Sequence, residues 1–258
     1  MAMPLVAVLL ISLLMSSSSH KTTIFIIGDS TAAEKGNYRN YPERGWGMVF
    51  QGCFDDQIIV DNHAVNGRSS KSFLDEGRWQ KVLDKIQPGD YVIIQFGHND
   101  EKINDPTRYA SPEQFAANLL AYARAAQAKG ALPVLITPLV RRHFEGDTLT
   151  PTHGAYPDAV RALASRENLP LIDLTAASAR LVQRLGEPAS RELYMVFAPN
   201  LYPNYPEGKT DNTHLRYAGA VKFTGLVADG LQTLGGAYAQ VLLAAPEKDK
   251  YDEKGYEG

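Results

Sequence analysis

The sequence contains a single cysteine, no excess of positive charge and no apolar run long enough to span a bilayer. Cys53 cannot form a disulfide within the chain, and a lone thiolate argues against a cysteine-rich zinc site. The formal net charge of −3 provides no basic field for nucleic acid or an anionic membrane surface. We therefore expect no nucleic-acid partner, and we expect Cys53 to be a small buried residue.

An apolar segment of residues 5–15 is followed by four serines. It is shorter than the roughly 20 residues that a bilayer-spanning helix needs, and it is typical of a secretory signal. No Lys or Arg precedes it and no A-x-A box follows it, so a buried first helix or an uncleaved anchor is the alternative. We expect an exported protein, secreted or periplasmic, with no stable membrane insertion after removal of the signal.

The remainder of the chain has the composition of one globular domain. Of the 258 residues, 44% are hydrophobic and 21% are charged, which is sufficient for a single large core. The sequence has no internal repeat and no low-complexity linker. We expect a signal peptide over residues 1–20, one domain over 21–240 and a polar tail over 241–258.

Strand-like and helix-like segments alternate through this domain. The strands are predicted at residues 22–27, 57–63, 90–96, 132–137 and 169–174. The helices are predicted at residues 46–54, 76–86, 111–130, 156–168 and 176–185, with a last one capped by Thr213 and ending near residue 234. Such alternation predicts an α/β fold in which helices cover both faces of a parallel sheet.

Polar stretches follow three of the predicted strands. These are Gly28–Ser30, His63–Ser70 and Gly97–Asp100, and a fourth, Asp211–His214, is expected to open the final helix. Ligands of open parallel sheets bind beyond the carboxyl ends of the strands, so the first three should meet at one edge.

A serine hydroxyl in such a place becomes a nucleophile only if a general base lies within hydrogen-bond reach. His214 can be that base for Ser30, and Asp211 can turn back to orient the imidazole. The Ser30 and Gly67 amides and the Asn99 side chain can donate to a developing oxyanion. The alternatives are a cap or turn for Ser30, a surface histidine for His214, and local turn roles for Gly67 and Asn99.

These residues match a family pattern. The chain resembles the SGNH, or GDSL-type, hydrolases, whose motifs place a Ser in G-D-S, then a Gly, then an Asn in G-x-N-D, then D-x-x-H. The resemblance spans residues 22–234. It implies a flavodoxin-like three-layer α/β/α sandwich with a five-stranded parallel sheet of order 2-1-3-4-5.

Within this family the sequence is most similar to the rhamnogalacturonan acetylesterases, at IIGDSTAA, NHAVNGRSSKSF, QFGHND and DNTHLRYAGA. The resemblance implies removal of acetyl groups from pectic polysaccharide, without a metal or cofactor. It also implies that Ser30 is the nucleophile, His214 the base and Asp211 its partner, with Ser30, Gly67 and Asn99 as the oxyanion hole.

Arginines near these motifs are candidates for binding the carboxylates of a uronic-acid polymer. Arg68 adjoins Gly67, and Arg141 and Arg142 follow the fourth strand. Ion pairing at the surface is the alternative for each. His98 and Asp100 are interpreted as structural neighbours of Asn99, and His143 and His153 as surface residues.

Two other functions remain open from the sequence. One is a lipid esterase or lysophospholipase of the same superfamily. The other is a non-catalytic flavodoxin-like protein, in which the GDSTAAEKG loop holds the phosphate of FMN. The second alternative gives Asp211 and His214 no role.

Overall fold

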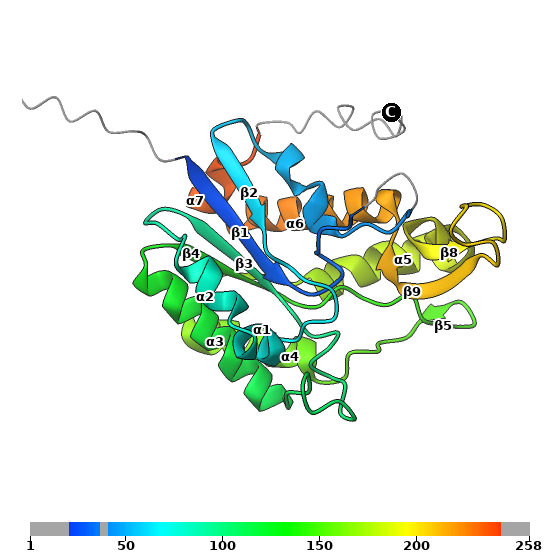
Figure 1. Cartoon of the computed structure of the whole chain (residues 1–258), viewed down its shortest axis with the longest axis horizontal. Helices are drawn as coiled ribbons and strands as arrows, with labels where there is room; N and C mark the ends of the chain where they lie inside the picture. The colour runs from blue at the N-terminus through cyan, green and yellow to red at the C-terminus, as the bar shows by residue number, and fades with distance from the viewer. Residues whose placement is uncertain (1–20, 37–40, 244–258) are drawn as a thin grey trace, which may run out of the picture.

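The computed structural model describes residues 21–36 and 41–243. Its centre is a five-stranded parallel sheet of order β2-β1-β3-β4-β7 (Figure 1). The strands are β1 (Thr22–Gly28), β2 (Ile58–Asn62), β3 (Tyr91–Gln95), β4 (Leu132–Ile136) and β7 (Leu171–Ile172). This arrangement confirms the predicted fold class and strand order, because β7 is the fifth strand of the expected pattern.

Both faces of the sheet are buried, as the continuous apolar runs predict. In β1, Ile24 and Ile26 belong to one core cluster, whereas Phe25 and Ile27 belong to the other. This alternation follows from the two-residue period of a strand. The sheet therefore forms the middle layer between two hydrophobic cores.

Helices α1 to α4 cover one face of the sheet, and α5 to α7 with two 3₁₀ turns cover the other (Figure 1). The first group comprises α1 (Ser70–Asp75), α2 (Arg78–Leu83), α3 (Pro112–Ala128) and α4 (Tyr156–Glu167). The second comprises η1 (Trp46–Met48), η2 (Phe50–Cys53), α5 (Leu174–Ser190), α6 (Tyr217–Leu234) and α7 (Gly236–Gln240).

The helix predicted most directly from capping signals is confirmed. In α3 the Ser111 side chain accepts a hydrogen bond from the Gln114 amide, and Pro112 occupies the first turn. These residues satisfy or remove amide donors that a helix start leaves unpaired.

Three predicted helices differ from the structure. The segment 46–54 forms the two 3₁₀ turns, and the predicted helix 76–86 is shortened to α2, residues 78–83. Gly77 separates α2 from α1 with a φ of +66°, a left-handed conformation that suits glycine. The last helix begins at Tyr217 rather than after Thr213, because residues 209–215 form a strand instead.

Two antiparallel hairpins lie outside the main sheet. One joins β5 (Phe144–Glu145) to β6 (Thr148–Leu149), and the other joins β8 (Tyr194–Phe197) to β9 (Lys209–Leu215). A 3₁₀ turn, η3 (Arg191–Leu193), leads into β8. The second hairpin matters for function because β9 carries Asp211 and His214.

The ends of the chain were predicted as a signal and a tail. The predicted signal lies outside the described residues, as does most of the predicted tail. The first tail residues do not extend into solvent, since Val241 and Leu242 pack against the core and the Leu243 amide donates to the Cys53 carbonyl. Cys53 is buried as expected, and burial raises the pKa of its thiol to about 11. Among the described residues, none of the helices combines the length and apolarity that crossing a bilayer requires.

Candidate active site

Ser30 lies directly beyond the carboxyl end of β1, at the start of a tight turn. The turn is closed by hydrogen bonds from the Ala32 and Ala33 amides to the Asp29 carbonyl. Gly28 lets β1 approach β3 at this point, because a Cβ there would lie 2.7 Å from the Gln95 carbonyl oxygen. The Ser30 side chain thus sits at the predicted edge of the sheet, with 7% of its surface exposed.

The β8–β9 hairpin brings a histidine and a carboxylate to this serine. His214 Nε2 lies 3.0 Å from Ser30 Oγ, and His214 Nδ1 lies 2.8 Å from Asp211 Oδ2. The Asp211 Oδ1 atom accepts hydrogen bonds from the Thr213 and His214 amides. These backbone contacts hold the carboxylate in place, so the aspartate orients the imidazole from its own strand.

Electrostatics favours one tautomer of His214. Burial acts to raise the pKa of Asp211, but hydrogen bonds from the His214 side chain and backbone outweigh it and hold this pKa well below its ordinary value. An ionised carboxylate can only accept, so Nδ1 must carry the proton that lies between the two groups. Nε2 is then the acceptor that faces the Ser30 hydroxyl.

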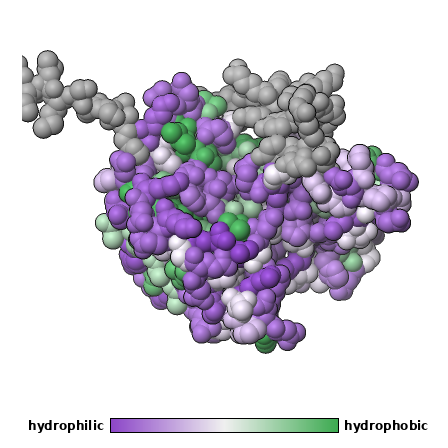
Figure 2. Space-filling model, viewed as in Figure 1, coloured by the Kyte–Doolittle hydropathy of each residue, from purple (hydrophilic) through white to green (hydrophobic). Residues whose placement is uncertain are grey.

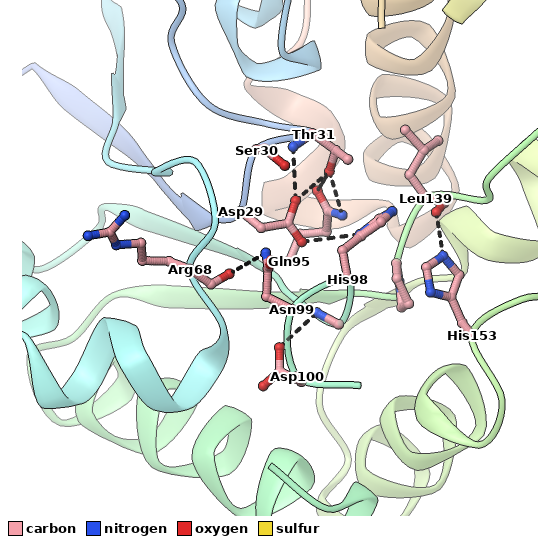
Figure 3. A network of polar contacts seen from close by, with 12 residues as sticks. Asp29, Ser30, Thr31, Arg68, Gln95, His98, Asn99, Asp100, Leu139 and His153 are labelled. Carbon is pink, nitrogen blue, oxygen red and sulfur yellow. Dashed lines mark hydrogen bonds and ion pairs between the residues drawn. The ribbon is translucent and has the colours of Figure 1, made fainter. Parts of the chain in front are cut away.

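Gly67 and Asn99 lie in two further loops at the same edge of the sheet. Gly67 has a φ of +75°, a left-handed conformation that disfavours a side chain. One hydrogen of the Asn99 amide is donated to the Arg68 carbonyl at 3.0 Å, as Figure 3 shows. The amide nitrogen carries a second hydrogen that can donate elsewhere. Lys102 donates to the Asn99 side-chain oxygen and fixes the amide orientation.

A buried polar network lies beneath Ser30 (Figure 3). The Asp29 carboxylate accepts from the Thr31 amide and hydroxyl and contacts His98 Nδ1 at 3.2 Å. Burial opposes ionisation of Asp29, but His98 and Thr31 lower its pKa to about 2. Gln95 bonds to Thr31 and accepts from Trp46 Nε1. Sequence reasoning identified none of Asp29, Thr31 and Gln95 as part of this support, although a polar Gln95 in an apolar strand is a visible signal.

Asp100 ties the Asn99 loop to the start of α1. It accepts from the Ser70 amide at 2.9 Å, from the Ser70 hydroxyl and from the Gly97 amide. Burial raises the pKa of Asp100 to about 7 despite the bonds from Ser70. The structural interpretation of His98 and Asp100 is therefore supported by their contacts.

The predicted substrate arginines are not equivalent. Arg142 is 5% exposed, and its guanidinium donates to Ser190, Asn212 and Glu187, so it holds the hairpin in place rather than facing a substrate. Sequence alone missed this because Glu187 and Asn212 are distant along the chain. The prediction of a substrate contact by Arg142 is therefore corrected.

Arg141 and Arg68 are both ion-paired. Arg141 pairs with Glu101 and lies beside His153, and Arg68 pairs with Glu76 along α1. The Arg68 guanidinium points away from Ser30 in Figure 3. A substrate contact by either side chain stays a prediction.

The remaining histidines differ from one another. His143 is 54% exposed, as expected of a surface residue. His153 is 3% exposed and contacts Glu101 and the Leu139 carbonyl, so the prediction of a surface position was wrong. Within residues 21–36 and 41–243, no cluster of three His, Cys, Asp or Glu side chains is arranged to hold a metal ion.

Comparisons with known proteins find a hydrolase family and acetylesterases that are similar to this chain. Residues 26–220 match the GDSL-like lipase/acylhydrolase family. The chain is 42% identical over 213 residues to the rhamnogalacturonan acetylesterase RhgT of Bacillus subtilis, covering 82% of this chain and 90% of that protein. A rhamnogalacturonan acetylesterase of Emericella nidulans is 27% identical over 208 residues, covering 73% of this chain and 81% of that one.

Solved structures agree on the fold. The crystal structure of protein YxiM from Bacillus subtilis superposes with a TM-score of 0.72 at 28% identity, covering 83% of this chain. This chain spans 57% of that larger structure. Axe2, an acetylxylan esterase from Geobacillus stearothermophilus, has a TM-score of 0.55 at 18% identity, covering 87% of this chain and 97% of its own, which shows a shared fold alone.

Proposed function

Because the chain belongs to the GDSL-like lipase/acylhydrolase family and is a carboxylic ester hydrolase, we propose that it removes acetyl groups from pectic rhamnogalacturonan through Ser30, His214 and Asp211. The observation that supports this most is the chain of contacts from Asp211 through His214 to the Ser30 hydroxyl, at 2.8 and 3.0 Å. Such a chain is what activation of a serine nucleophile requires.

The first half of the reaction forms an acyl-enzyme. The Ser30 oxygen attacks the acetyl carbonyl carbon while His214 Nε2 takes the hydroxyl proton. Asp211 stabilises the imidazolium that results. The negative charge moves to the acetyl oxygen, where the Ser30 and Gly67 amides and the Asn99 side chain donate to it. Collapse of this intermediate releases the sugar oxygen, which receives the proton from His214.

The second half regenerates the enzyme. Water attacks the acetyl-Ser30 carbonyl while Nε2 accepts one of its protons. The same donors stabilise the second tetrahedral intermediate. His214 then returns the proton to Ser30 Oγ, and acetate leaves. The proposed steps use these side chains, the two backbone amides and water.

A polar polysaccharide is the substrate that the comparisons favour. Three relatives with rhamnogalacturonan acetylesterase in their names each match most of this chain. The molecular face seen in Figure 2 is mainly hydrophilic, which fits a carbohydrate better than an acyl chain. A lipid esterase would instead show a rate that rises with acyl chain length.

The test is acetate release from acetylated rhamnogalacturonan, acetylated xylan and acetylated mannan. We expect the highest kcat/KM on rhamnogalacturonan, and loss of activity in Ser30→Ala. Ser165→Ala, which removes an exposed hydroxyl on α4, is the matched control and should behave as the wild type. Equal turnover by Ser30→Ala would end the proposed mechanism, and a preference for long-chain esters would end the proposed substrate.

We also propose that the protein is exported, because a pectic polysaccharide substrate lies outside the cell. It is supported by the apolar segment of residues 5–15. Mass spectrometry of protein secreted by the producing cells should find a mature N-terminus near residue 21. A mature protein that keeps residues 1–20 would contradict cleavage.

A further inference from the structure

A cleft opens beside the glycine of the proposed oxyanion hole. Its volume is about 470 Å³, within the range usual for small-ligand sites. Gly67 and Arg68 form part of its wall, together with α1 and the loop that contains Thr107 and Arg108. The cleft therefore adjoins the proposed oxyanion hole at Gly67, and the proposed chemical steps do not use the rest of it.

Among the cations of this cleft, Arg108 has a guanidinium that approaches Gly67. A Cβ built on Gly67 would lie 3.6 Å from Arg108 Nη1, so the guanidinium faces the glycine backbone. The ion pair between Arg108 and Asp105 is made through Nε at 3.0 Å. Nη1 is thus the part of Arg108 nearest to a substrate held against Gly67.

Other positive groups gather around the same place. Arg68 and Lys71 line the cleft with Arg108. Lys102 lies close by and donates to Asn99, and burial followed by the charges of Arg108 and Arg141 lowers its pKa. Cations held this close repel one another, so an anion bound among them would be stabilised.

Two acidic side chains, Asp75 and Glu76, line the cleft together with three cations, Arg68, Lys71 and Arg108. Asp75 pairs with Lys71, and Glu76 pairs with Arg68. These pairs are partly exposed, and exposed pairs contribute little to stability, so a substrate carboxylate can compete for the cations. Arginine is suited to this exchange because it binds a carboxylate bidentately.

We propose that this cleft is a subsite for a uronic-acid carboxylate of the acetylated polymer, and that Arg108 determines specificity there. The inference rests on the proposed esterase function and deepens it. It assigns recognition of the acidic sugar to Arg108, with Lys71 and Arg68 in support, and not to Arg142. A polymer of neutral sugars would offer the cleft's cations no carboxylate to exchange for their partners within the protein.

The experiment compares two substrates that differ only in charge. An acetylated oligosaccharide containing galacturonate is assayed beside the same oligosaccharide after chemical reduction of its carboxyl groups to alcohols. The measured quantity is the ratio of kcat/KM for the acidic substrate to that for the reduced one. We expect a wild-type ratio well above one, and a fall of about tenfold in Arg108→Gln, the loss expected for one charge-assisted contact.

Two further variants complete the test. Lys71→Gln should lower the ratio by a smaller factor. Arg124→Gln removes an exposed cation of α3 that pairs with Glu167 of α4. This variant should leave the ratio and the kcat/KM for each substrate unchanged. Thermal unfolding of each variant checks that the protein is folded.

The outcomes distinguish failure of the proposed subsite from failure of the proposed esterase function. Hydrolysis of p-nitrophenyl acetate by the wild type tests the esterase alone. An active esterase with a ratio near one, or with equal ratios in wild type and Arg108→Gln, overturns the subsite. An inactive wild type overturns the proposed function and the subsite together.

Discussion

Replacing Asp211 by asparagine tests the role of the carboxylate with little change in shape. The introduced amide keeps an oxygen that can accept from the Thr213 and His214 backbone, so the hairpin should stay folded. Its nitrogen, however, donates where the carboxylate accepted. His214 Nδ1 would then become the acceptor, and Nε2 would carry a hydrogen toward Ser30. A protonated Nε2 cannot take the serine proton.

The size of the effect follows from the distance between the charges. For an imidazolium nitrogen 2.8 Å from a carboxylate oxygen, Coulomb's law gives about 6 kcal/mol at an effective dielectric of about 20, and about 3 kcal/mol at about 40. His214 and Asp211 are 30% and 20% exposed, which favours the lower value. At about 1.4 kcal/mol per decade, kcat/KM should fall by roughly 100-fold to 10,000-fold.

The assay is hydrolysis of p-nitrophenyl acetate by wild type and Asp211→Asn at the same pH. Asp158→Asn removes an 80% exposed carboxylate on α4 and is the matched control, with unchanged kcat/KM expected. If Asp211→Asn keeps more than a tenth of the wild-type kcat/KM while remaining folded, the assignment of Asp211 as the orienting group fails.

Three further predictions concern stability. Gly225→Ala, at a position in α6 where a Cβ would meet nothing within 4 Å, should raise the free energy of unfolding in urea by about 0.5–1 kcal/mol. Gly219→Ala in the same helix would place a Cβ 2.0 Å from the Leu193 carbonyl oxygen, so it should lower that free energy by more than about 2 kcal/mol. A stabilising effect at residue 219 would contradict the close approach of α6 to η3. Burial raises the pKa of Asp100 from 3.8 to about 7, so the folded protein keeps a proton that the unfolded chain has lost. The free energy of unfolding should therefore fall as pH rises from about 4 to 7, and Asp100→Asn should flatten this part of the pH profile, whereas an unchanged slope would show that Asp100 does not titrate there.

The sheet could be predicted because its strands are continuous apolar runs. Residues 91–95 are entirely buried, and the continuous apolar run from Tyr91 to Ile94 is typical of a strand covered on both faces. The positions of Ser30, Gly67 and Asn99 follow from the same signal, since each lies shortly after a strand of the sheet. A parallel sheet then brings the three loops to one edge without further information.

The element that carries His214 could not be predicted in the same way. The sequence KTDNTHL has the polar composition of a helix start, with Asp and Thr as apparent caps. It forms a strand because β8 pairs with it, with Met195 opposite Asp211. This pairing joins segments separated by a long loop, so it cannot be predicted from the local strand or helix propensity of either segment.

Contacts between buried polar residues also could not be predicted from the local sequence. Arg142 was predicted to meet substrate because its charge is visible in the sequence, but its partners are 45 to 70 positions away. The Asp29–His98 contact joins residues 69 positions apart beneath the serine. Such pairs are set by the folded topology, which decides whether an ionisable side chain supports the site or faces the ligand.

Covalent labelling is the most direct test of the central claim that His214 makes Ser30 a nucleophile. The protein is treated with a fluorophosphonate, digested and examined by mass spectrometry. We predict a single adduct on the peptide containing Ser30 in the wild type, and no adduct there in His214→Ala within the same time. Labelling of a different serine, or equally fast labelling of Ser30 without His214, would contradict the account.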